Sequence, residues 1–221
     1  MHVMNVTQEA SCPVVRSARS GVGLEVPLSL RLRESSRELH QVVEVKLGLP
    51  WTIMGWDDYV ACLSRFHRLY RPLEQQLRVF LDWLDHGFDA VGHGYTVSFA
   101  SDLGLLLPPG APLPRDVSGE ACLNLPSFAH ALGARYVLEG PTLGGEVILR
   151  RLLQSGVEGA ATARAFLGIC KQRPGGWQNF RAALDRYGKE RMRAVPHVVT
   201  SAKRSFWAMD EWLQSTRWKE T

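Results

Sequence analysis

Apolar side chains recur at intervals of three and four residues over most of the chain, which is the pattern of amphipathic α-helices. The first such stretch runs from Ser29 to Leu47. We expect Ser29 to cap its N-terminus, and Gly48 with Pro50 to close it. Its apolar positions are Leu32, Leu39, Val43 and Leu47.

A second stripe with 3.6-residue spacing predicts a long helix from Trp56 to about Leu84. Pro72 lies inside it and is expected to break or kink the helix, because proline lacks a backbone N–H. Residues 86–94 read as a glycine-interrupted connection. The segment Tyr95–Phe99 alternates weakly like a strand, but an isolated short strand would have no partner. We therefore expect a loop or a short helix there.

Four further helical stretches follow, and no βαβ alternation or repeat accompanies them. The sequence therefore predicts an all-α, single-domain fold. Residues 1–27 show no periodicity and read as a flexible tail, which leaves residues 28–215 for the helical domain. The four predicted stretches are residues 126–153, interrupted at Gly140–Gly145, and residues 159–170, 176–187 and 191–213.

Charge and cysteine content narrow the function classes. The 221 residues carry a net charge of +4 and no dense run of Lys or Arg, which argues against a nucleic-acid partner. No apolar run approaches the roughly 20 residues of a membrane span. The cysteines are far apart, with no CxxC pair, which fits a reduced cytoplasmic protein better than a disulfide scaffold or a zinc ribbon. They are Cys12, Cys62, Cys122 and Cys170.

One face of the first predicted helix carries Arg33, Ser36, His40 and Glu44. Glu44 follows His40 by one turn, so its carboxylate can hold one imidazole nitrogen and leave the other for a metal. Arg33 precedes His40 by about 10 Å along the helix axis, a distance that suits an anionic group at the edge of a large ligand. Spacing alone favours the simpler interpretation, a half-exposed histidine with an ordinary i,i+4 partner.

Glycines interrupt the strongly helical run YVLEGPTLGGEVILRRLL, residues 136–153. Each interior glycine costs a helix about 1 kcal/mol relative to alanine, and a proline such as Pro141 costs about 3 kcal/mol. A bent helix would explain them, as would close approach of a flat ligand to a backbone without Cβ atoms. A loop between two separate helices would give the same pattern.

At these residues the chain resembles a known family. The run ALGARYVLEGPTLGGEVILRRL is similar to the distal-helix signature of bacterial biliverdin-producing haem oxygenases, of the type associated with bacteriophytochromes. SSRELHQVVE resembles the segment of that family that carries the haem-ligating histidine. The stretch RFHRLYRPLEQQL, the spacing from Phe166 to Trp177-x-x-Phe180, and Phe206 with Trp212-Leu213 also fit. The resemblance covers about Leu28 to Leu213.

The resemblance implies a helical bundle that holds haem between a proximal helix and a kinked, glycine-rich distal helix. His40 would be the axial ligand of the haem iron, and Glu44 would be its hydrogen-bond partner. Gly140, Gly144 and Gly145 would line the distal face, with Gly140 and Gly144 closest to the reaction. Haem would be substrate and prosthetic group together. The remaining residues implied to contact haem are Arg33, Arg135 and Arg181 at the propionates, and Tyr136 and Phe206 beside the ring.

The implied reaction uses O2 and external electrons to convert haem to biliverdin, carbon monoxide and ferrous iron. A ferredoxin or a flavoprotein reductase would be the electron donor, and a bacteriophytochrome could receive the biliverdin. Pro141 departs from the family pattern, which usually has serine there, so the distal water has lost one polar group. Two alternatives stay open: a haem carrier or sensor on the same scaffold, and a related helical enzyme that binds no haem.

Overall fold

The computed structural model describes residues 26–47, 56–90, 94–113, 123–140, 147–148, 150, 153–154 and 176–214. Within these ranges the regular structure is helical and contains no strand, as the periodicity predicts. The elements are α1 (Leu28–Leu47), α2 (Trp56–Leu77), α3 (Gly94–Leu106), α4 (Phe128–Glu139), α7 (Gly176–Glu190), the 3-10 turn η2 (Met192–Ala194) and α8 (Val195–Gln214). The predicted helix at residues 159–170 lies outside the described residues, and the division at residue 27 stays a prediction.

Helix α1 begins one residue earlier than the sequence predicts, and Ser29 is not its cap. Ser29 is the second helical residue, and its backbone N–H and its hydroxyl donate to the two carboxylate oxygens of Asp185, at 2.8 and 3.0 Å. Asp185 lies on α7, so a carboxylate from a distant part of the chain accepts the Ser29 N–H of the first turn, while the N–H groups of Leu30 and Arg31 donate to the Pro27 carbonyl. Negative charge at a helix N-terminus is also favourable to the helix dipole.

Helix α2 passes through Pro72 without breaking and ends at Leu77, seven residues before the predicted end. The chain turns there: the N–H of Phe80 and the indole N–H of Trp83 both donate to the Leu77 carbonyl, at 3.3 and 3.2 Å. Leu84, the last member of the predicted stripe, is consequently exposed. The apolar spacing placed the end of the helix too late, because the side chain of Trp83 caps α2 at Leu77 and spacing does not reveal such a cap.

The segment predicted as a loop or short helix is the start of the 13-residue helix α3. Tyr95, Phe99 and Leu103 are spaced by four residues and are all buried on one side of it. Phe99 stacks on Phe66 of α2 at a centroid distance of 5.6 Å, and Tyr70 of α2 meets it edge-on at 5.4 Å. Burial against α2 therefore stabilises a helix whose own sequence signal is weak.

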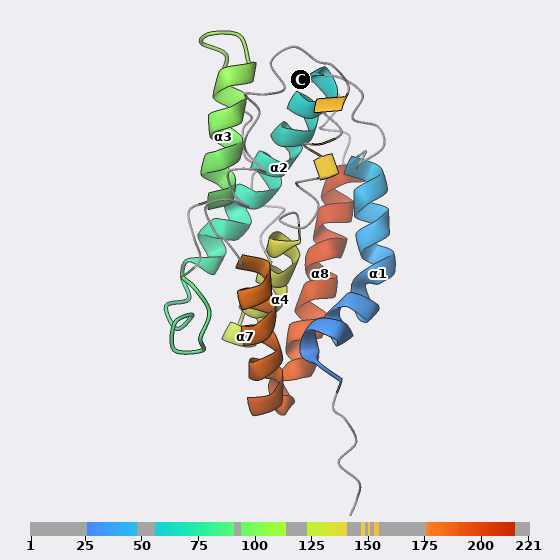
Figure 1. Ribbon diagram of the computed structural model, residues 1–221, viewed down its shortest axis with the longest axis vertical. Coiled ribbons are helices and arrows are strands. Elements are labelled where there is room, and N and C mark those ends of the chain that lie inside the picture. The colour runs from blue at the N-terminus through green and yellow to red at the C-terminus, as the bar shows by residue number, and fades with distance from the viewer. Residues whose placement is uncertain are drawn as a thin grey trace, which may run out of the picture.

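The last predicted helix is two elements, because the chain forms the turn η2 before α8 starts at Val195. Helices α1 and α8 lie side by side on one side of the molecule and α2 and α3 on the other, with α4 and α7 between them (Figure 1). Helix α8 packs against both α1 and α4.

Gly133 allows α4 and α8 to approach closely. A Cβ atom at this position would lie 2.2 Å from the carbonyl oxygen of Val198 and 2.9 Å from the backbone nitrogen of Ala202. These are backbone atoms that cannot rotate away, so a side chain would force the helices apart. The Ser201 hydroxyl adds a 2.6 Å hydrogen bond to the His130 carbonyl across the same interface.

We expect Gly133→Ala to lower the free energy of unfolding by about 3 kcal/mol, because overpacking against backbone strains the interface. Denaturant unfolding measures the change. The control is Gly104→Ala on α3, where a Cβ would meet nothing within 4 Å. That exposed change should stabilise the protein by about 0.5–1 kcal/mol through helix propensity alone. Equal effects of the two substitutions would contradict a tight α4–α8 contact.

Candidate haem-binding site

The face of α1 predicted to carry chemistry holds a histidine and a carboxylate in contact. His40 Nδ1 lies 3.2 Å from Glu44 Oε2, and the two side chains are 48% and 45% exposed. In a neutral imidazole a proton on Nδ1 leaves Nε2 with its lone pair. Glu44 therefore orients the ring so that Nε2 is the nitrogen able to bind a metal from the solvent side of α1.

Helix α8 places one aromatic side chain, Phe206, against the His40 ring. The Phe206 ring is buried and meets the His40 ring edge to face, with centroids 5.7 Å apart. Farther along both helices, six residues after His40 and four after Phe206, Lys46 of α1 and Asp210 of α8 form an ion pair. Sequence analysis missed this pair, because nothing in the local pattern connects residues so far apart. It holds α1 and α8 together beside the imidazole.

The other end of the same face of α1 meets α4. The Tyr136 phenol and the Ser36 hydroxyl share a hydrogen bond, and the charge of Arg33 acts on the same phenol. Burial raises the pKa of Tyr136, and the Ser36 hydrogen bond and Arg33 oppose that rise. The Ser36 hydroxyl in turn donates to the Leu32 carbonyl at 2.7 Å. The structure thus brings the predicted residues Arg33 and Tyr136 together, with the Arg33 side chain exposed.

A row of aromatic side chains connects α4 to α7. Tyr136 lies 5.9 Å from Trp177 between ring centroids, and Trp177 lies 6.0 Å from Phe180. The predicted residue Arg181 follows on α7 and is exposed. Tyr136 and Phe206 therefore flank the His40 face of α1 from two different helices, which is an arrangement suited to a flat apolar ligand with charged groups at its edge.

Arg135 occupies a different place from the one predicted. It is 2% exposed, and its Nε and Nη1 atoms donate to Glu139 Oε1 at 3.2 Å and to the Asp89 carbonyl at 2.6 Å. The guanidinium also lies 4.7 Å from the Trp83 ring centroid and 5.4 Å from that of Phe180. These interior contacts leave it no exposed surface for a propionate, so we do not include it among the proposed haem contacts.

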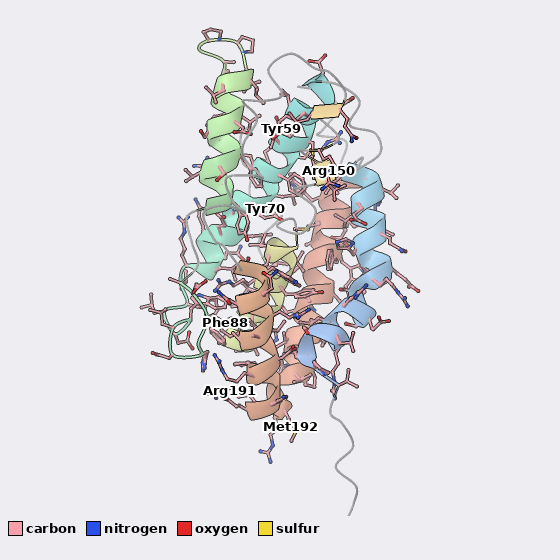
Figure 2. All side chains as sticks on the ribbon, in the orientation of Figure 1. Tyr59, Tyr70, Phe88, Arg150, Arg191 and Met192 are labelled. Carbon is pink, nitrogen blue, oxygen red and sulfur yellow. The ribbon has the colours of Figure 1, made fainter. Side chains whose placement is uncertain are left out.

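Polar groups that sequence analysis missed surround Glu139, the last residue of α4. The Tyr95 hydroxyl donates to Glu139 Oε2 at 2.6 Å, and the Tyr70 hydroxyl donates to the Leu138 carbonyl at 3.3 Å. Figure 2 labels Tyr70, which projects from α2 into the interior. The spacing of Arg135 and Glu139 by four residues in an otherwise apolar helix is the one signal that could have indicated this buried pair.

A second buried carboxyl lies on α2. Glu74 accepts hydrogen bonds from the Thr96 hydroxyl at 2.5 Å and from the Thr96 backbone N–H at 3.4 Å, and Arg78 lies 3.7 Å away. Burial raises the pKa of Glu74, while the Thr96 hydrogen bonds and Arg78 oppose the rise. The interior between α2, α3 and α4 is therefore hydrogen-bonded rather than purely apolar.

Comparison with known proteins decides the family. No protein-family model matches the sequence. Over 135 residues, which make up 58% of this chain and 73% of the other protein, the chain is 34% identical to the haem oxygenase of Xanthomonas campestris pathovar campestris (strain 8004). The chain belongs to the haem oxygenase family. Its all-α structure agrees with the fold that the resemblance implies.

Of the three glycines expected to line the distal face, only Gly140 is among the described residues. Gly140 ends α4 with helical angles, φ −54° and ψ −48°. Among the described residues, a Cβ atom here would meet only the Val137 carbonyl oxygen of the same helix, at 3.2 Å. Gly144, Gly145 and the predicted kink lie outside the described residues, as does Pro141.

The described residues were also compared with the requirements of a metal site built from side chains and of a membrane-spanning helix. In the described part of the chain, no three or more His, Cys, Asp or Glu side chains come together to hold a metal ion. None of the described helices combines the length and apolar character needed to cross a membrane.

We expect Arg135→Met to lower the free energy of unfolding by about 3 kcal/mol, because it leaves the Glu139 carboxylate buried without its cation. Arg181→Met is the matched control on the exposed surface of α7, and its effect should stay within about 0.5 kcal/mol. Denaturant unfolding of both variants is the measurement. Equal stabilities would mean that Arg135 is not held in the interior.

Proposed function

We propose that this member of the haem oxygenase family cleaves haem to biliverdin, carbon monoxide and ferrous iron, with O2 and electrons from an external donor. His40 is the axial iron ligand in this proposal. The observation that carries it is the His40–Glu44 contact on an open face of α1. It presents an imidazole held at Nδ1 with Nε2 available, which is the ligand type of haem proteins with a histidine axial ligand.

The described residues fit a haem on this face. The porphyrin is flat and apolar, and the rings of Phe206 and Tyr136 border the His40 face from α8 and α4. The propionates are anionic and need cations. Arg33 is exposed, lies about 10 Å along α1 from His40, and is our proposed propionate partner, with Arg181 of α7 as the second.

The proposed distal side begins at Gly140 and continues through Gly144 and Gly145. A backbone without Cβ atoms allows the ring to approach closely and shields one of its edges. Pro141 offers no side-chain donor and no N–H at this point. Glu139, which directly precedes Gly140, keeps a carboxylate hydrogen-bonded to the Tyr95 hydroxyl. We propose that the Glu139 carboxyl and the Tyr95 hydroxyl help to position the distal water, for which Pro141 supplies no hydrogen-bonding group.

The proposal also includes the partner proteins and the cellular location. Electrons would come from a ferredoxin or a flavoprotein reductase, and a bacteriophytochrome would be one recipient of biliverdin. The assignment to the bacteriophytochrome-associated type rests on the distal signature quoted above. A cytoplasmic location accords with the absence of paired cysteine spacing and with Cys62, which is a free, buried thiol.

One observation favours a second function on the same scaffold. The replacement of the family's distal serine by Pro141 removes a polar group from the side where O2 is activated. A protein that binds haem through His40 but no longer cleaves it would act as a haem carrier or sensor. The same experiment separates the two functions.

The test is a single turnover of the full chain loaded with one equivalent of hemin. Ascorbate, or ferredoxin with its reductase, is added in air and the absorption spectrum is followed. Loss of the Soret band with a rising biliverdin band and released carbon monoxide supports cleavage. A persistent haem spectrum would indicate the carrier, and a Soret band that never shifts from that of free hemin would exclude both.

We expect His40→Ala to abolish the histidine-ligated haem spectrum and turnover, because no iron ligand remains on the α1 face. The control is Gln41→Ala, the next residue of α1 and also exposed, which should leave both unchanged. Absorption and resonance Raman spectra of the hemin complexes report the ligand. An iron–histidine signal that survives in His40→Ala would move the ligand elsewhere.

We expect Arg33→Glu to weaken hemin affinity about tenfold, since it replaces a charge-assisted contact to a propionate by repulsion. Arg31→Glu makes the same change of charge two residues earlier on α1, where the Arg31 side chain donates to the Val26 carbonyl. It should change the affinity much less. Fluorescence quenching titrations with hemin give the dissociation constants of both variants. Equal losses of affinity would mean that the overall charge of the protein, and not a contact of Arg33, causes the effect.

A further inference from the structure

Two histidines outside the proposed haem site face each other where α4 meets α8. His130 is in the first turn of α4 and His197 is in the first turn of α8. Their ring centroids are 5.2 Å apart and their planes are inclined by 40°. Neither residue has a part in the proposed haem chemistry, and their separation in sequence matches no recognised metal-binding spacing.

The protein holds this pair in place from several directions. The Ser127 hydroxyl is 2.8 Å from His130 Nδ1, which fixes the ring and leaves Nε2 as the free nitrogen. The Ser201 hydroxyl, one turn after His197 on α8, donates to the His130 carbonyl at 2.6 Å. The close contact at Gly133 sets the spacing of the two helices just beyond the pair. Little ordering cost therefore remains for a ligand that joins the two rings.

The spacing of the rings suits one shared metal ion. In a zinc–imidazole bond the Zn–N distance is about 2.0–2.1 Å, which puts the ring centroid about 3.2 Å from the ion. Two such rings at a tetrahedral angle have centroids about 5.2 Å apart. The observed separation is 5.2 Å. Contacting rings in proteins ordinarily lie about 4.5–7 Å apart, and this pair has the separation that a shared ion needs.

The surroundings of His130 favour its neutral, metal-binding form, and one nearby cation, Arg204, opposes the binding of a metal ion. Burial lowers the pKa of His130, and the neighbouring His197 and Arg204 lower it further. The imidazole is therefore neutral at pH 7, as a metal ligand must be. Arg204 is the cation that faces the pair, and it reduces the affinity for a divalent ion. His197 is exposed, so water can complete the coordination.

We propose that His130 and His197 form a two-histidine Zn²⁺ site that links the first turns of α4 and α8, with water in the remaining positions. Bound metal would fasten the interface that positions α4, independently of haem. The site differs from the His40 site in its ligands, which lie on α4 and α8, whereas His40 lies on α1.

The experiment is a Zn²⁺ titration of the chelator-stripped, tag-free full chain at pH 7.5, by calorimetry and by the shift of the unfolding midpoint. One equivalent of Zn²⁺ should bind and raise the midpoint. His130→Ala and His197→Ala should each weaken binding at least tenfold, and His197→Gln should do the same while keeping a side chain of similar size. Unfolding midpoints without metal confirm that the variants fold.

Two controls make the outcome decisive. His40→Ala should leave Zn²⁺ affinity unchanged, and Arg204→Ala should raise it several-fold by removing the opposing charge. Binding at pH 5.5 should be weaker, because protons compete for the imidazoles. Equal affinity in the native protein and the His130 and His197 variants, loss of binding in His40→Ala, or no binding at all would each overturn the proposal.

Discussion

The close approach of α4 to α8 at Gly133 is the constraint on which the rest of the structure depends. The position leaves no room for a Cβ between α4 and the backbone at Val198. Because α8 also packs against α1, the same helix sets where the two halves of the proposed haem site lie. Helix α4 carries Tyr136 and α1 carries His40, so the α4–α8 interface helps to set the distance between these two helices.

The proposed site follows from three helices that meet along one face of α1. Glu44 orients His40 from within α1, Phe206 contacts the imidazole from α8, and Tyr136 reaches Ser36 from α4. Each contact is modest by itself. Together they leave Nε2 of His40 and the cation of Arg33 on the same exposed face, which is what an amphipathic, dianionic macrocycle requires. Membership of the haem oxygenase family accords with this arrangement.

The polar interior between α2, α3 and α4 comes at an energetic cost that its hydrogen bonds offset. Arg135, Glu139 and Glu74 are almost completely buried, and each has charged or hydroxyl partners within hydrogen-bond distance or close to it. Apolar residues would pack such an interior more cheaply. Glu139 is the last residue of α4, so the network reaches the C-terminal end of that helix.

The sequence by itself determined the helical class, most helix positions and the face shared by Arg33, His40 and Glu44, because a 3.6-residue period reports which side of a helix is apolar. It also pointed to the family through the glycine-rich run. It could not show what each face meets. Only the tertiary structure decided that Asp185 satisfies the start of α1, that Trp83 ends α2, and that packing on α2 makes α3 a full helix. Arg135 looked like a ligand for an anion, but it is buried against Glu139. For Asp185 and for the packing of α3 on α2, the deciding partner is far away in the sequence, and local periodicity contains no information about distant partners. Trp83 and Glu139 lie only six and four residues from the groups they contact, but those contacts depend on the turn after α2 and on burial, which periodicity does not report either.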